Sequence, residues 1–165
     1  MNPLISQLKK LGPISIETEN KILQKTKFTT RKKGDFFLKK GQTVSNMFVL
    51  ETGCIRGFYN KGDKEINTFF GFENELIGSF LPLFSNLPSY ENLQFLEDAA
   101  LYYISANDLN ALYSEDMSLI PSAEKWLNIT VLFLKNELRP CRFIRRKNVT
   151  FYCRKNIRKR CSEFL

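Results

Sequence analysis

The chain has 165 residues, enough for one domain with a real core, and its hydrophobic content of 43%, with fifteen Phe, excludes a disordered protein. It contains no histidine, which excludes Ser-His and Cys-His catalytic pairs, His-based zinc sites and haem held by histidine. The formal net charge of +8 is unevenly placed, because residues 1–135 carry fifteen basic and fifteen acidic side chains, whereas residues 136–165 carry ten and two.

Two amphipathic helices are predicted at the N-terminus. Residues 3–11 carry four aliphatic side chains at helical spacing, and Gly12-Pro13 ends this segment. Ser15 is a typical N-cap for the second helix, whose first turn contains Glu17 and Glu19.

From Phe28 onward the hydrophobic period changes to two, and glycine turns separate short apolar runs. The predicted strands are residues 28–32, 36–38, 47–50, 55–59, 65–70, 90–95 and 99–105. Short strands at this spacing are typical of a sandwich or barrel of the jelly-roll kind.

Residues 69–105 predict a unit that could form a pocket. A strand leads to the turn at Gly78-Ser79, a short apolar segment follows at Phe80–Phe84, and a strand returns after Pro88. Backbone N–H groups at the start of a short helix favour anions. A single glycine before a short helix is more often plain structural punctuation of the chain, so this interpretation stays open beside that of a pocket.

Two further helices are predicted, over residues 106–114 and 121–138. The second one is apolar on two faces, and its second stripe consists of Trp126, Ile129 and Phe133. A helix with two apolar faces must bury both, which predicts a homodimer through residues 121–138 with these three residues at the interface. The alternative is a helix packed entirely within its own domain.

In this order the elements resemble a cyclic-nucleotide-binding domain, most closely the sensor half of the Crp/Fnr transcription regulators. The resemblance covers about residues 5–138 and rests on four motifs: FFLKKGQ (36–42), MFVLETGCIR (47–56), ELIGSF (75–80) and PSYENLQFLED (88–98). It implies a mainly β fold with flanking helices, a double-stranded β-helix (jelly roll) followed by a long dimerisation helix. The iron–sulfur cluster of the Fnr type is excluded, since no cysteine precedes Cys54.

The resemblance also implies where a ligand would bind. In that family the glycine turn holds the cyclic phosphate, a Glu after the Gly binds the ribose, and an Arg pairs with the phosphate. This chain keeps Gly78, has Ser79 in place of the Glu, and has no Lys or Arg between Lys64 and Lys125; the place of the Arg falls within Tyr90-Glu91-Asn92. A carboxylate beside a phosphate is repulsive, which argues against cyclic AMP or GMP, so we expect no cofactor.

The candidate pocket could instead bind a neutral small-molecule effector, or nothing, the fold then serving as a dimerising scaffold. Ser79 and Asn92 are the predicted hydrogen-bonding groups, although ordinary turn or strand polarity explains them as well. The candidate ligand-binding residues are Leu76, Ile77, Gly78, Ser79, Phe80, Tyr90, Asn92, Leu93 and Thr130.

We expect three parts: a β-roll with N-terminal helices at 1–115, a dimerisation helix at 116–138 and a basic tail at 139–165. The tail is too short for the helix-turn-helix domain of Crp/Fnr regulators. Back-translation permits a shifted frame that resembles how such regulators continue, so we hypothesise a one-base frameshift near Arg139–Cys141.

The predicted function is therefore a non-enzymatic sensor and dimerisation domain of a Crp/Fnr-like regulator that lacks its DNA-binding half, with no DNA binding in this form. The alternative is a binding module whose basic tail contacts nucleic acid or an anionic membrane. A cupin-like enzyme would need imidazole ligands for its metal, and the four cysteines form no C-x-x-C pair, so no metal site is predicted. With no apolar run of roughly 18 residues and no signal peptide, we expect a cytoplasmic protein.

Overall fold

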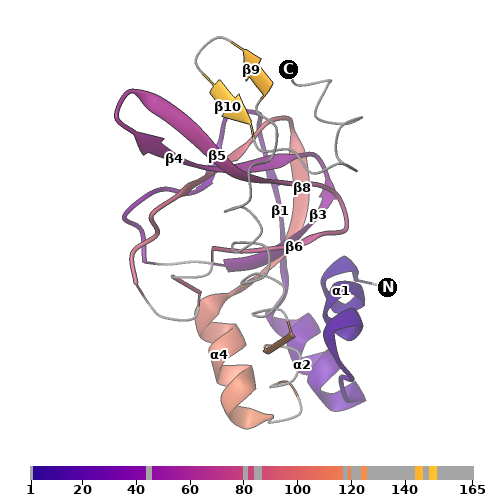
Figure 1. Ribbon diagram of the computed structural model, residues 1–165. Helices are drawn as coiled ribbons and strands as arrows, with labels where there is room; N and C mark the ends of the chain where they lie inside the picture. Colours follow the sequence, from indigo (N-terminus) through magenta and orange to yellow (C-terminus); the bar gives the residue numbers. More distant parts are fainter. Residues whose placement is uncertain are drawn as a thin grey trace.

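The computed structural model describes residues 2–43, 46–79, 82–83, 87–116, 119, 124–125, 144–146 and 149–151. Figure 1 shows the strands gathered in one part of the molecule and the three labelled helices packed together at its other end. Gly34, Gly41, Gly53 and Gly62 lie in turns between strands, as the sequence predicts for a jelly roll.

Both predicted N-terminal helices form, and each has a side-chain cap. In α1 (Pro3–Leu11) the Leu4 N–H donates to Asn2 Oδ1 at 2.9 Å, and a proline occupies the first turn, where its missing N–H costs nothing. In α2 (Ile16–Lys25) the Thr18 N–H donates to Ser15 Oγ at 3.1 Å, which confirms Ser15 as the N-cap.

The strands form two sheets. The four-stranded sheet has the order β1-β8-β3-β6, and the six-stranded sheet has the order β2-β7-β4-β5-β10-β9. All pairings among β1 to β8 are antiparallel. Their bounds are β1 (Lys27–Arg31), β2 (Phe36–Leu38), β3 (Asn46–Thr52), β4 (Ile55–Lys61), β5 (Lys64–Gly71), β6 (Leu76–Ile77), β7 (Asn92–Phe95) and β8 (Ala99–Ser105). The predicted mainly β roll with flanking helices is confirmed.

Strand β3 contributes to two hydrophobic cores because its successive side chains point to opposite faces. Phe48 and Leu50 belong to the core between the sheets, whereas Met47 and Val49 pack on the side of the helices. Most other members of the second core come from α1, α2 and α4 (Ala106–Glu115), the helix that follows β8, and the rest are Leu83, Ile104 and Leu119. The helices are therefore fixed to the outside of the four-stranded sheet.

The basic tail contains two short strands that the sequence does not predict. The backbone of β10 (Val149–Phe151) pairs in parallel with β5 at Glu65 and Ile66, and antiparallel with β9 (Ile144–Arg146). An edge strand offers unpaired N–H and C=O groups to any extended backbone, whatever its side-chain period. This pairing explains why a segment without alternating hydrophobicity can still extend the sheet (Figure 1).

The predicted dimerisation helix falls almost entirely outside the described residues. Within residues 121–138 the structure describes Glu124 and Lys125, which are helical. In the described part of the chain, no helix has the length and apolarity to cross a membrane.

Candidate functional site

Four buried polar residues meet beside the glycine turn, and we call them the Glu91 cluster. They come from three segments: Thr68 from β5, Ser79 from the turn after β6, and Ser89 and Glu91 from the segment that leads into β7. Their exposed fractions are 9% for Thr68, 1% for Ser79, 2% for Ser89 and 5% for Glu91. Buried polar groups need hydrogen-bond partners, and these residues supply them to one another.

The carboxyl group of Glu91 lies at the centre of the cluster. Thr68 Oγ1 donates to Glu91 Oε2 at 2.9 Å, and Ser79 Oγ donates to Oε1 at 3.3 Å. The hydroxyl groups of Ser79 and Ser89 are 3.3 Å apart. Ser89 Oγ donates to the Glu91 carbonyl at 2.8 Å and accepts from the Glu91 N–H at 3.2 Å. The cluster thus ties the glycine turn to β5 and to the start of β7.

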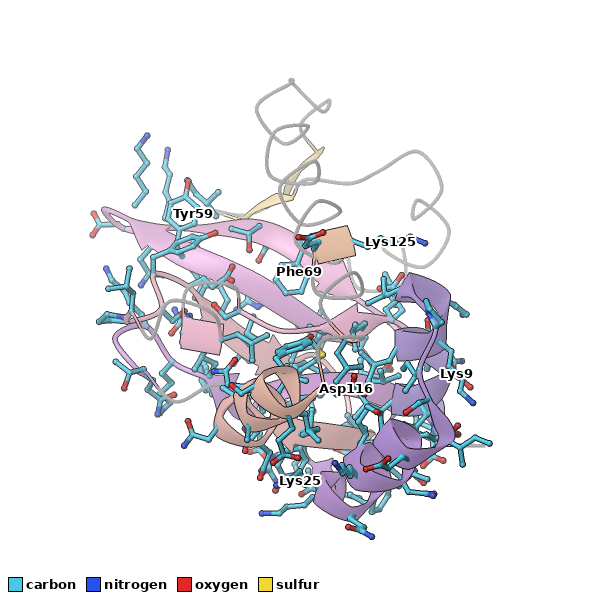
Figure 2. All side chains as sticks on the ribbon, turned by 90° about the horizontal axis from the view of Figure 1, so that it is seen from below. Lys9, Lys25, Tyr59, Phe69, Asp116 and Lys125 are labelled. Carbon is cyan, nitrogen blue, oxygen red and sulfur yellow. The ribbon has the colours of Figure 1, made fainter. Side chains whose placement is uncertain are left out.

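Thr68 reaches this position because of a bulge between β4 and β5. Gly57 pairs with Phe69 and Phe58 pairs with Asn67, so Thr68 is an extra residue on β5. A Cβ atom at Gly57 would lie 2.7 Å from Thr68 Oγ1 and 2.4 Å from a ring carbon of Phe69, which is labelled in Figure 2. The missing side chain of Gly57 is therefore what lets the bulge approach β4.

Burial raises the pKa of the Glu91 carboxyl above its usual value, and the hydrogen bonds from Thr68 and Ser79 oppose this rise. No basic group lowers the pKa of this carboxyl, in agreement with a sequence that has no Lys or Arg from residue 65 to 124. An uncompensated buried carboxyl is favoured in its protonated form.

The arginine on the neighbouring strand is occupied on the other face of the sheet. Arg56 lies between Ile55 and Gly57 on β4, so its side chain leaves the face opposite to theirs. Its guanidinium donates to Gln94 Oε1 at 2.7 Å and forms an ion pair with Glu65 at 2.8 Å. Arg56 therefore cannot serve as the cationic partner of an anion held over the glycine turn.

Of the candidate residues from the sequence, Ser79 is the one that joins the cluster. Ile77 and Leu93 are core residues between the sheets, and Leu76 and Gly78 are half-buried. Gly78 does not adopt a positive φ. Its conformation therefore does not itself require glycine.

The two candidates next to Glu91 have other contacts. Tyr90 is 41% exposed and its ring centre lies 6.3 Å from that of Tyr59, which Figure 2 labels on β4. Asn92 Oδ1 accepts from the backbone N–H of Lys40 at 3.0 Å, which fixes the turn after β2. Phe80, Thr130 and the proposed interface residues Trp126, Ile129 and Phe133 lie outside the described residues.

Sequence reasoning missed Thr68 and Ser89 as members of the site. Ser89 stands in the motif that carries the resemblance, and its position two residues before Glu91 was an available signal. Thr68 gave no such signal, since it reaches Glu91 across 23 residues through a bulge.

Comparison with known proteins agrees with this fold. The sequence profile of the cyclic nucleotide-binding domain matches residues 29–116, slightly more than half of the chain. The chain therefore belongs to the cyclic nucleotide-binding domain family. No curated protein sequence gives a significant match.

Solved structures with the same fold include transcription regulators of the Crp/Fnr kind. The sensor domain of the regulator DNR from Pseudomonas aeruginosa has a TM-score of 0.67 and 15% identity, covering 85% of this chain and 93% of that one. Catabolite activator protein from Thermus thermophilus has a TM-score of 0.66 and 17% identity, covering 80% of this chain and 61% of that one.

The regulatory domain of Toxoplasma gondii PKA, solved with cAMP, has a TM-score of 0.57 and 12% identity, covering 65% of this chain and 43% of that one. This chain thus spans 61% of the length of the Thermus activator and less than half of the Toxoplasma protein. At these identities the likeness is one of fold.

Proposed function

We propose that the chain is the ligand-sensing, non-enzymatic domain of a Crp/Fnr-like transcription regulator. We also propose that it does not bind cyclic AMP or cyclic GMP, because the residues of its candidate pocket include no basic side chain to pair with the cyclic phosphate. The family and the fold support the sensor role. The ligand part rests on one observation: a buried carboxyl, Glu91, occupies the region where the resemblance places an arginine.

The energetic argument concerns the cyclic phosphate. A buried anion needs fixed donors and a positive charge, and loss of that partner costs several kcal/mol. In the Glu91 cluster the hydroxyls of Thr68 and Ser79 already donate to the carboxyl. A phosphate placed there would have no arginine to pair with. It would also lie beside the Glu91 carboxyl, which repels it when ionised.

Isothermal titration with cyclic AMP and cyclic GMP tests this proposal. We expect no binding tighter than about 1 mM, which corresponds to about −4 kcal/mol. A cAMP-binding regulatory domain of the same fold, such as that of Toxoplasma PKA, serves as the positive control. Micromolar binding of either nucleotide would refute the part of the proposal that concerns the ligand.

A further inference from the structure

We propose that Glu91 is a proton-operated latch, which closes the glycine turn onto β5 and β7 when its carboxyl is neutral and releases it on ionisation. This inference rests on the proposed function, because it names how the same site of the sensor domain would be regulated. The argument begins with the number of protons that the cluster needs.

Consider first the ionised carboxylate. Thr68 and Ser79 each donate their single hydroxyl proton to it, and Ser89 donates its proton to the Glu91 carbonyl. A serine hydroxyl has one proton to give. No proton is then left for the 3.3 Å contact between the Ser79 and Ser89 hydroxyls, which become two oxygens facing each other.

The neutral acid supplies the missing proton. A protonated Oε1 donates to Ser79 Oγ, and Ser79 is then free to donate to Ser89 Oγ. Ser89 still donates to the Glu91 carbonyl, and Thr68 still donates to Oε2. Every short contact in the cluster then contains one proton, and no charge is buried. A fully satisfied buried network of this kind is rigid, whereas a partly satisfied one is costly.

Among the residues that the structure describes, no basic group faces Glu91, so the ionised form is stabilised by the hydroxyl donors of Thr68 and Ser79 and by no opposite charge. The side of the sheet that faces Glu91 presents Thr68 from β5 and Gly57 from β4, while the turn and the segment before β7 present Ser79 and Ser89.

The charged residues of the neighbouring strands point elsewhere in the part of the chain that the structure describes. Arg56 and Glu65 pair with each other on the other face of the sheet, and the charged ends of the β4–β5 hairpin, Lys61 and Lys64, are exposed. Glu75, which precedes β6, accepts a hydrogen bond from the Phe72 N–H at 3.0 Å.

The direction of the pH effect follows from linkage. Burial raises the pKa of Glu91 in the folded state above its unfolded value. The stabilisation is therefore complete below the unfolded pKa and is lost as pH rises through the folded pKa. Above that pH the buried carboxylate needs to be hydrated. Separation of the glycine turn from β5 admits water to it while breaking few other contacts.

The experiment compares urea unfolding of the wild type and Glu91→Gln from pH 4 to pH 9, without ligand. The amide donates to Ser79 Oγ and accepts from Thr68, so the variant imitates the neutral acid. Between the unfolded and the folded pKa of Glu91, we expect the unfolding constant of the wild type to increase relative to that of Glu91→Gln by up to tenfold per pH unit. Glu51→Gln, at an exposed carboxylate at the end of β3, is the matched control and should follow the wild type.

Two further measurements locate the effect and guard against a variant that does not fold. Amide hydrogen exchange should show that Leu83 and Glu91, whose N–H groups bond to Ser79 and Ser89, lose protection at high pH in the wild type but not in Glu91→Gln. Carboxyl ¹³C NMR of the wild type should show one glutamate that titrates above the rest.

Parallel unfolding curves for wild type and Glu91→Gln, or glutamates that all titrate together, would overturn the latch. Neither readout involves a nucleotide. Micromolar binding of cyclic AMP would thus refute the proposed ligand preference without deciding whether Glu91 acts as a latch.

Discussion

Two single residues determine the character of the candidate site. Glu91 supplies the ionisable group, a carboxyl whose side-chain partners are the hydroxyls of Thr68 and Ser79. Gly57 supplies the space, because its missing Cβ leaves room for the bulge that carries Thr68. A side chain at Gly57 would therefore also disturb the contacts of Glu91, because the bulge opposite Gly57 supplies a donor to the carboxyl.

A Gly57→Ala substitution should therefore destabilise the domain by overpacking, by about 1–3 kcal/mol in urea unfolding. Its Cβ would overlap a ring carbon of Phe69, at 2.4 Å. If this overlap is the cause, Phe69→Leu should recover part of the loss in the double variant.

The control for Gly57 is Gly34→Ala. Gly34 has a φ of +91° and no atom within 4 Å of its added Cβ, so its cost is conformational. Phe69→Leu should not relieve that cost. Equal rescue of both glycine variants would show that the overlap at Gly57 is not the reason for its effect.

At the scale of elements, capping side chains determine where the helices begin. Ser105 is the N-cap of α4: its Oγ accepts from the Asp108 N–H at 3.1 Å and donates to Asp108 Oδ2 at 2.6 Å. Lys25 at the end of α2 forms an ion pair with the same carboxylate at 3.1 Å. The start of α4 is thus attached to the end of α2.

Ser105→Ala should cost about 0.5–2 kcal/mol of unfolding free energy, the usual value of an N-cap. Ser114→Ala, an exposed serine in the last turn of the same helix, should change it by less than about 0.5 kcal/mol. Urea unfolding at neutral pH measures both. Similar losses in the two variants would contradict the capping role.

The effect of Ser105→Ala should depend on pH. The hydrogen bond from Ser105, followed by that from Lys25, holds the pKa of Asp108 below its usual value. A lowered pKa gives stability that is present above the unfolded pKa and lost as pH falls through the folded one. The difference between wild type and Ser105→Ala should therefore narrow in acid.

At the scale of the whole molecule, the sequence predicts how two copies of the chain would associate. The amphipathic pattern of residues 121–138 predicts a homodimer with Trp126 at its seam. Trp126→Glu should then convert a dimer into a monomer in sedimentation equilibrium, because a seam does not accommodate a charge. Lys125→Glu adds an acidic residue at a neighbouring exposed position and should remain dimeric. A monomeric wild type would refute the seam.

Much of the fold could be predicted from the sequence because local signals agree with the tertiary structure. The capping residues Ser15 and Ser105 precede helices that bury one apolar face. The glycine turns separate strands whose apolar residues alternate or, as in β3, face a core on both sides. These patterns act over a few residues, so they are readable before any contact is known.

The Glu91 cluster was decided by tertiary structure. The sequence alone established that no Lys or Arg occurs between Lys64 and Lys125, the stretch that contains the glycine turn, and this was enough to question a phosphate ligand. It could not establish that Glu91 is buried, or that Thr68 donates to it, because both depend on a bulge opposite Gly57 and on two sheets closing around it. Burial is a property of the packed molecule, and burial is what turns an ordinary surface acid into a group with a raised pKa.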